Sequence, residues 1–261
     1  MSGLGSASHP EHNGGAYHLG IRPGDLPPYV LLPGDVDRVE KIAATWEEAK
    51  PVAKRRQFAS YTGIYKGVRL GVVSTGIGGP AVTIAVEELA DAGVHTFIRV
   101  GSSGSVREDV RVGEVVITKA AARFDGASSV YAPAGYPASS DPDVFSALVK
   151  AAKGLGVSYH KGITASFDAF YVAQGRPGHG GFLPREKRAW LEDMRALNIT
   201  NIEMEAATLL TMTNVYGLRG GVVCAVFADR LRDEFGERGE AQAISVANEA
   251  VKILYSEDER E

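Results

Sequence analysis

The chain has 261 residues, a net charge of −4 at neutral pH and 44% hydrophobic residues. This length and hydrophobic content exclude a disordered protein and suit one large α/β domain. The acidic charge balance argues against nucleic-acid binding as the main function, and no apolar run is long enough to cross a bilayer. Residues 1–15 lack the apolar segment of a secretion signal, and the single cysteine, Cys224, lies within an apolar run. We therefore expect a cytoplasmic protein with a buried, inert thiol.

Apolar runs rich in Val and Ile alternate with amphipathic patterns along the chain. Lys66-Gly67 is typical of a hairpin turn, Pro80 suits a first helical turn, and Asp141 suits a helix start. The predicted strands are, in chain order, residues 29–32, 62–65, 68–74, 95–100, 114–118, 158–165, 199–202 and 219–227. The predicted helices are, in chain order, residues 36–44, 80–92, 141–155, 184–197, 204–216 and 242–255.

This alternation predicts the fold class. Strands joined through helices favour parallel pairing, because a crossover helix returns the chain to the same end of the sheet. We expect an α/β fold: a single three-layer α/β/α domain over residues 16–256, with a central mixed, largely parallel sheet. Residues 1–15 are expected to form a flexible tail, residues 177–184 a mobile glycine-rich loop, and residues 257–261 a frayed acidic tail.

Residues 76–81 match the G-x-G-x-x-A pattern of dinucleotide-binding turns, between a predicted strand and a predicted helix. That motif expects an acidic residue about 20 positions further on to hold a ribose hydroxyl. The region there contains Thr96 and Arg99 instead, which argues against a nicotinamide-dependent enzyme. Two interpretations remain: a backbone anion site at a helix N-terminus, and a tight strand-to-helix turn.

Three arginines are candidates for binding an oxyanion. Arg38 follows a Gly-Asp pair, Arg99 lies inside an apolar strand, and Arg56 ends a basic cluster. A guanidinium fits phosphate because it donates several hydrogen bonds in a planar fork. Gly34 and Ser102 could complete the site, and the lack of a Walker A lysine motif favours a free inorganic anion over ATP. The alternatives are a helix-surface ion pair for Arg38, a buried structural ion pair for Arg99 and a solvated loop for the cluster.

Two further segments carry the groups needed to bind a nucleoside. Phe170 can stack on a planar ring, while Gln174 and Arg176 can hydrogen-bond its polar edge. Glu203 and Glu205 lie where a strand gives way to a helix, and a carboxylate there can accept hydrogen bonds from a vicinal diol. A base-binding and a ribose-binding segment together indicate a nucleoside substrate, with phosphate as its nucleophile. No cluster of Cys and His residues has the spacing of a structural zinc site.

In these segments the chain resembles the family-I nucleoside phosphorylases, most of all the uridine phosphorylases. The matching stretches follow the family's order over most of the chain: residues 32–43, 74–80, 99–104, 170–176 and 203–205. Gln174 and Arg176 are the most specific part, because this Gln-x-Arg element distinguishes uridine-cleaving from purine-cleaving members. The resemblance implies reversible phosphorolysis of uridine, or 2′-deoxyuridine, to uracil and the pentose 1-phosphate. It also implies a hexamer built as a trimer of dimers.

The resemblance further implies a role for each matching residue. Inorganic phosphate is the implied co-substrate, with no other cofactor and no metal. The implied phosphate site consists of Gly34, Arg38, Arg56, Arg99 and Ser102, with Arg56 supplied by a neighbouring subunit. The implied ribose site consists of Glu203, Met204, Glu205 and the neighbour's His18. The implied base site consists of Phe170, Gln174, Arg176 and Arg230. The implied catalytic residues are Arg38, Arg99, Gln174, Arg176 and Glu205.

Two departures from the family pattern bear on function. Some relatives bind potassium at a dimer interface through a Glu and a Ser, but Gln57 and Ala81 stand at these positions, so we do not expect that ion. Asp229 stands before Arg230 in place of the usual Asn, and purine-cleaving relatives have an Asp near this point. A purine nucleoside phosphorylase using Asp229 is therefore one alternative, unless Asp229 pairs with Arg230 or Arg38. A non-catalytic nucleoside-binding protein is the other.

Overall fold

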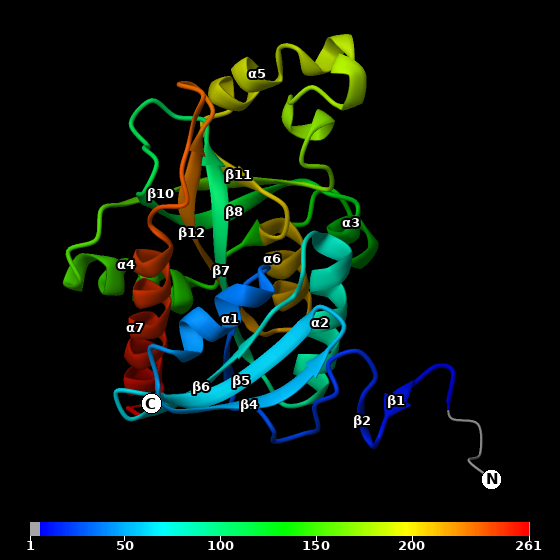
Figure 1. Cartoon of the computed structure of the whole chain (residues 1–261), viewed down its shortest axis with the longest axis vertical. Helices are drawn as coiled ribbons and strands as arrows, with labels where there is room; N and C mark the ends of the chain where they lie inside the picture. Colours follow the sequence, from blue (N-terminus) through cyan, green and yellow to red (C-terminus); the bar gives the residue numbers. More distant parts are fainter. Residues whose placement is uncertain (1–5, 261) are drawn as a thin grey trace.

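The computed structural model of the chain describes residues 6–260 (Figure 1). Within these residues, an 11-stranded sheet has the order β13-β12-β8-β10-β11-β7-β3-β6-β5-β4, with β9 paired to β8. A separate two-stranded sheet contains β1 (Glu11–His12) and β2 (Gly15–Ala16). The strands of the large sheet are β3 (Tyr29–Leu32), β4 (Glu47–Arg55), β5 (Phe58–Tyr65), β6 (Val68–Val73), β7 (Thr96–Ser105), β8 (Val115–Phe124), β9 (Ala138–Ser139), β10 (Tyr159–Phe167), β11 (Ile199–Glu203), β12 (Arg219–Asp229) and β13 (Glu234–Phe235).

The large sheet is mixed. β3 pairs in parallel with β6 and β7, and the pairs β7–β12, β8–β10 and β10–β11 are also parallel. At one edge, β4, β5 and β6 form an antiparallel meander. Because β12 pairs with both β7 and β8, the strands β7, β11, β10, β8 and β12 close on one another. The expected α/β fold with a mixed sheet is therefore confirmed, whereas this closure was not predicted.

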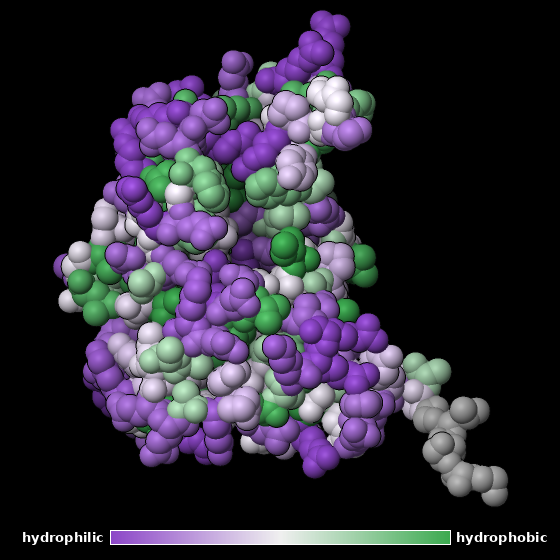
Figure 2. All heavy atoms as spheres, viewed as in Figure 1, coloured by the Kyte–Doolittle hydropathy of each residue, from purple (hydrophilic) through white to green (hydrophobic). Residues whose placement is uncertain are grey.

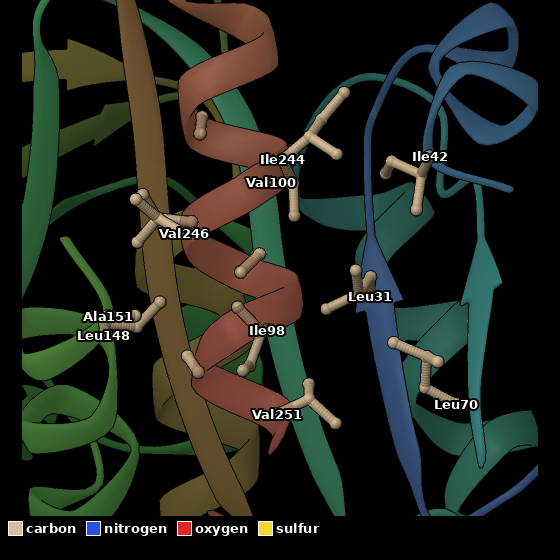
Figure 3. Packing of buried hydrophobic residues seen from close by; sticks show 14 of the residues in the cluster. Leu31, Ile42, Leu70, Ile98, Val100, Leu148, Ala151, Ile244, Val246 and Val251 are labelled. Atoms are coloured by element: carbon tan, nitrogen blue, oxygen red, sulfur yellow. The ribbon is translucent and has the colours of Figure 1, made fainter. Parts of the chain in front are cut away.

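Helices cover both faces of the sheet. The helices are α1 (Val36–Ala43), α2 (Gly79–Asp91), α3 (Ala127–Tyr131), α4 (Pro142–Gly154), α5 (Trp190–Ala196), α6 (Ala206–Val215) and α7 (Glu240–Asp258). Alternate strand residues face opposite sides, so Ile98 and Val100 of β7 join a core with α1, α4 and α7. Phe97, which precedes Ile98 and faces the opposite side of the sheet, joins a second core with α2 and α6. Figure 3 shows the first core, where Ile244 of α7 approaches Val100.

The short elements α3, β9 and β13 were not predicted, and three longer elements differ from the predictions. β7 continues through residues 101–105, beyond the strand predicted at residues 95–100, because the small side chains there allow extended pairing with β12. β4 was missed; it is an edge strand with mostly exposed side chains, so it lacks the apolar alternation of a buried strand. The helix expected at residues 184–197 is a 3₁₀ turn, Arg185–Lys187, followed by the shorter α5.

The chain ends also differ from the predictions. Helix α7 extends to Asp258, so the first two residues of the expected acidic tail, 257 and 258, are helical. Glu257 pairs with Lys150 at 2.7 Å, and Asp258 accepts two hydrogen bonds from Arg219, at 2.8 and 2.6 Å. At the other end, the expected flexible tail contains β1 and the first residue of β2, while residues 1–5 and 261 lie outside the described residues.

The segment that leads to α5 projects from the body of the molecule (Figure 1). Figure 2 shows a hollow in the surface beneath this projection, with hydrophilic residues gathered in it. Trp190, the first residue of α5, packs edge-on against Phe167 of β10 with 5.4 Å between ring centroids. The helices within residues 6–260 include none with the length and apolar character needed to span a membrane.

Candidate active site

A cavity of about 860 Å³ opens where β7, β11 and β12 end, beside the start of α1. Most of the residues that we predicted for binding lie around it. They are Gly34, Arg38, Arg99, Ser102, Phe170, Gln174, Arg176, Glu203, Met204, Glu205 and Arg230. The fold thus brings together segments from distant parts of the sequence in a space large enough for a nucleoside and an anion.

One end of the cavity is rich in hydrogen-bond donors. Arg176 donates through Nη1 to the Phe170 carbonyl at 2.9 Å and to Gln174 Oε1 at 2.5 Å, and Arg230 donates to the Gln174 carbonyl at 3.0 Å. Gln174 is buried, and its Nε2 has no hydrogen-bond partner among the described residues. A buried amide without a partner is costly, so this N–H₂ group is suited to a carbonyl acceptor on a ligand.

The local backbone produces this arrangement. A 3₁₀ turn, Val172–Gln174, ends at Gly175, whose φ of +68° lies in the left-handed region that favours glycine. A Cβ at Gly175 would also lie 3.2 Å from Trp190, so the turn packs directly on that indole. The Arg176 guanidinium lies 4.0 Å from the centroid of the Phe170 ring, a cation–π distance. The aromatic, amide and guanidinium groups predicted from the sequence are therefore held side by side.

The charges at this end favour a partner with negative character. Burial and the neighbouring Arg230 lower the pKa of Arg176 to about 10, so Arg176 remains a cation at neutral pH. Burial likewise lowers the pKa of Arg230. Both guanidiniums would gain from an anion or a carbonyl oxygen in the cavity, because such a partner offsets their lost hydration.

Two buried glutamates, Glu203 and Glu205, line the cavity. Glu203 accepts hydrogen bonds from the backbone amides of Glu205 and Ala206, from Ser166 Oγ at 2.5 Å and from Arg99 Nε at 2.9 Å. These donors occupy both of its oxygens, so Glu203 anchors the start of α6 and orients Arg99. Its expected ribose contact has less support than that of Glu205.

Glu205 lines the cavity with a different set of partners. Its Oε1 accepts the backbone amide of Gly78, and its Oε2 lies 2.5 Å from Arg99 Nη2. Burial and the adjacent Glu203 raise the pKa of Glu205, although Arg99 and the Gly78 amide oppose this shift. The two carboxylates raise the pKa of Arg99 despite its burial, so Arg99 stays charged. The structural ion pair considered for Arg99 is present, and it lies within the cavity wall.

Arg38 lies beside Arg99 in the cavity wall. It is buried, donating from Nε to Glu240 at 2.7 Å and from Nη1 to the Val100 carbonyl at 3.1 Å. The alternative for Arg38 was an ion pair on the helix surface. The ion pair exists, but Arg38 is buried and does not lie on the surface. Glu240 was missed because it lies 202 residues from Arg38 and shows no local sequence signal.

The remaining candidates for the oxyanion site are backbone and small side chains. Gly34 and the facing Gly76 pack so closely that a Cβ on Gly34 would lie 3.1 Å from the Gly76 carbonyl. A Cβ on Gly101 would lie 2.8 Å from Arg99 Nη2, so the absence of a side chain at Gly101 leaves room for the Arg99 guanidinium. Ser102 follows directly and lines the same end of the cavity. Together these groups offer donors and space for a small anion.

His18 and Arg56 do not line this cavity. His18 Nδ1 pairs with Glu88 at 2.7 Å, and Arg56 donates to the Tyr17 hydroxyl at 3.2 Å. The Tyr17 ring also packs edge-on against the His18 ring, with 4.8 Å between centroids, so His18 and Arg56 belong to one cluster around Tyr17. Their expected roles in a neighbour's site stay predictions.

Asp229 does not point a free carboxylate at a ligand. Its Oδ1 accepts the backbone amides of Leu231 and Arg232, and its Oδ2 pairs with Arg232 Nη1 at 2.7 Å and with Arg111 at 3.8 Å. The alternative pairing of Asp229 with Arg230 or Arg38 is not observed, because the turn after β12 brings Arg232 back onto the carboxylate. Asp229 therefore stabilises the turn that carries Arg230, which weakens the purine alternative.

Comparison with known proteins agrees with this geometry. The model of the phosphorylase superfamily matches residues 28–255. The chain belongs to this superfamily. It is 52% identical to a uridine phosphorylase of Thermococcus kodakarensis, over 97% of this chain and 92% of that protein. It is 41% identical to a uridine phosphorylase of Escherichia coli, over 91% of this chain and 97% of that protein. A guanosine phosphorylase of Halorubrum lacusprofundi is 37% identical over 80% of this chain and 81% of its own.

Within this superfamily, the chain is thus similar to uridine phosphorylases at higher identity and coverage than to the guanosine phosphorylase. The sequence-based resemblance is confirmed at the level of the family. The buried, structurally engaged Asp229 agrees with this order, because it supplies no free acid at the base end of the cavity.

Proposed function

We propose that this enzyme catalyses the reversible phosphorolysis of uridine to uracil and ribose 1-phosphate, with 2′-deoxyuridine as a further candidate substrate. The observation that carries the proposal is one cavity with three chemically distinct parts. These are the donor edge of Gln174 and Arg176, the buried carboxylate of Glu205, and the guanidiniums of Arg38 and Arg99.

The base end suits uracil as a leaving group. Uracil has two carbonyl oxygens, and negative charge grows on them as the glycosidic bond breaks. The unpartnered Gln174 amide and the buried Arg176 cation can donate to these oxygens. Because both are already held in place, they stabilise that charge without having to reorganise, and such donors are worth several kcal/mol in transition states, about 3–4 for a single donor.

Ribose and phosphate occupy the rest of the cavity in this proposal. Glu205 accepts hydrogen bonds from the ribose hydroxyls and favours the positive charge of an oxocarbenium-like ribose. Arg38 and Arg99 hold inorganic phosphate near C1′, with donors from Gly34 and Ser102. The advantage is positional, since a nucleophile held in line reacts as if it were highly concentrated. Phosphate is the co-substrate, and no other cofactor enters the proposal.

We also propose that the working enzyme is an oligomer, a hexamer built from dimers, in the cytoplasm. Oligomerisation accounts for His18 and Arg56, which lie together near Tyr17 but away from their own chain's cavity. The cytoplasmic location rests on the single cysteine, Cys224, which is fully buried and whose pKa burial raises to about 12.

The decisive experiment measures free base released from uridine and from inosine, each with and without inorganic phosphate. Uracil release that requires phosphate is the expected result. Hypoxanthine release instead would favour a purine phosphorylase, and release without phosphate would indicate a hydrolase. Binding of uridine without release of base would indicate a nucleoside-binding protein.

A further inference from the structure

We propose that Glu240 is a positioning residue for phosphate: it holds the Arg38 guanidinium in the orientation that binds the anion. The inference rests on the proposed function, because it assumes that Arg38 contacts phosphate. Glu240 itself does not line the cavity, whereas Arg38 does. Its role is therefore to act through Arg38 and not to touch the substrate.

The contacts of Arg38 leave one of its edges free. Nε donates to Glu240 Oε1 at 2.7 Å, and Nη1 donates to the Val100 carbonyl at 3.1 Å. These two bonds fix the plane of the guanidinium against α7 and β7. Nη2 makes no hydrogen bond with the described residues, and it remains available to the cavity that Arg38 lines. A guanidinium whose plane is already fixed loses less conformational entropy on binding phosphate than a freely rotating one.

Glu240 is itself held rigidly. Its second oxygen, Oε2, accepts a hydrogen bond from Lys41 Nζ at 2.7 Å, and Lys41 lies on α1 close to Arg38. Glu240 is the first residue of α7, and the preceding Gly239 has a φ of +82°. A Cβ on Gly239 would lie 2.5 Å from the Gly113 carbonyl, so the backbone is tightly packed at this point. Residues 233–235 and 237, which come shortly before Glu240, contribute to the wall of the same cavity.

Charge alone predicts the opposite effect from positioning. Glu240 carries a negative charge next to a site for a phosphate dianion, so its removal should strengthen phosphate binding if only the net charge matters. If Glu240 orients Arg38, its removal should weaken phosphate binding. The direction of the change in KM for phosphate therefore decides between the two explanations.

The test compares Glu240→Ala, Glu240→Gln and the matched control Glu249→Ala. Glu249 lies on the same helix and pairs with Lys66 at 2.6 Å, but it does not line the cavity. We expect Glu240→Ala to raise the KM for phosphate about tenfold, the loss of one charge-assisted hydrogen bond. The KM for uridine should stay within about twofold. Glu240→Gln keeps an oxygen acceptor for Arg38 Nε, so it should retain most of the phosphate affinity.

Calorimetric titration of each variant with inorganic phosphate gives the same comparison without turnover. A Kd for phosphate that rises in Glu240→Ala, but not in Glu249→Ala, supports the proposal. An unchanged or lower Kd in Glu240→Ala overturns it, as does an equal rise in the control. Because phosphate binding is measured directly, a wild-type protein that fails to cleave uridine would refute the proposed function and leave this comparison decisive.

Discussion

The backbone amide of Gly78 donates a hydrogen bond to the carboxylate of Glu205, although 127 residues separate them in the sequence. Gly78 precedes α2, so the carboxylate lies at a helix N-terminus, where partial positive charge favours an anion. Residues 76–81 were interpreted either as a backbone anion site or as a tight strand-to-helix turn, and the structure combines both. The turn is tight, and the anion at its amide is a side chain of the protein itself.

Replacing Gly78 by Ala should impair binding of the nucleoside. Gly78 has a φ of +91°, so an L-residue there is strained by about 1–3 kcal/mol, and the amide that meets Glu205 would shift. We expect a lower melting temperature and a higher KM for uridine. Gly67→Ala is the matched control, since its φ is +84° in a hairpin turn with no atom near the added Cβ. It should lower the melting temperature alone, and a raised KM for uridine in both variants would contradict the assignment.

Arg176→Ala should reduce uridine cleavage far more than phosphate affinity. Arg176 is a buried cation at the donor edge, and loss of one such donor costs about 100- to 1,000-fold in kcat. Steady-state kinetics with each substrate varied in turn would measure both effects. The exposed Arg185, which does not line the cavity, provides an Arg→Ala control that should leave kcat unchanged. Equal losses for uridine and phosphate would count against the assignment.

Asp229→Asn should affect stability more than specificity. Asn keeps an oxygen for the Leu231 and Arg232 amides but loses the ion pair with Arg232, at a cost of about 1.5–3 kcal/mol. Chemical denaturation and a uridine-to-inosine activity ratio would test this. The ratio should be the same as in the wild type. If the variant instead loses an inosine activity that the wild type has, Asp229 is a catalytic acid.

Mixing two inactive variants should restore activity if subunits share sites. An Arg56→Ala chain keeps an intact cavity, and an Arg176→Ala chain keeps an intact Arg56. Co-refolded or co-expressed hetero-oligomers would then contain some complete sites, so uracil release should exceed that of either variant alone. Activity that stays at the level of the separate variants would place Arg56 outside the neighbour's site.

The C-terminal end of α7 should contribute stability that depends on pH. Hydrogen bonds from Arg219 hold the pKa of Asp258 below its ordinary value, and Tyr29 also donates to this carboxylate. A depressed carboxyl pKa stabilises the fold above the unfolded pKa, near 4, and this contribution is lost as pH falls through the folded pKa. Asp258→Asn should therefore lower the melting temperature at pH 7, with the difference from wild type shrinking below about pH 4.

The exposed Glu259 offers a control for this pH effect. Glu259→Gln should leave the melting curve unchanged at both pH values. If Asp258→Asn lowers the melting temperature by the same amount in acid as at pH 7, packing and not charge holds the end of α7.

Periodicity predicted the elements that are buried, such as β3 and β12, because apolar side chains there must face one or both cores. The site segments were also found, since their polar groups interrupt apolar runs. The pairing of Arg38 with Glu240 and the closure through β12 depend on long-range packing, which leaves no local pattern. Asp229 shows the limit most clearly: its residue type suggested an acid, and only the turn to Arg232 revealed a structural role.

Trp190 gives the protein an optical reporter of its base site. Its indole packs against Gly175, the residue that separates Gln174 from Arg176 in the sequence. The centroid of the indole lies 5.8 Å from the Arg230 guanidinium. The second tryptophan of the chain, Trp46, donates to Asn248 in a distant part of the core. A Trp46→Phe protein would therefore emit from Trp190 alone, and quenching by uracil could follow ligand entry in real time without any label.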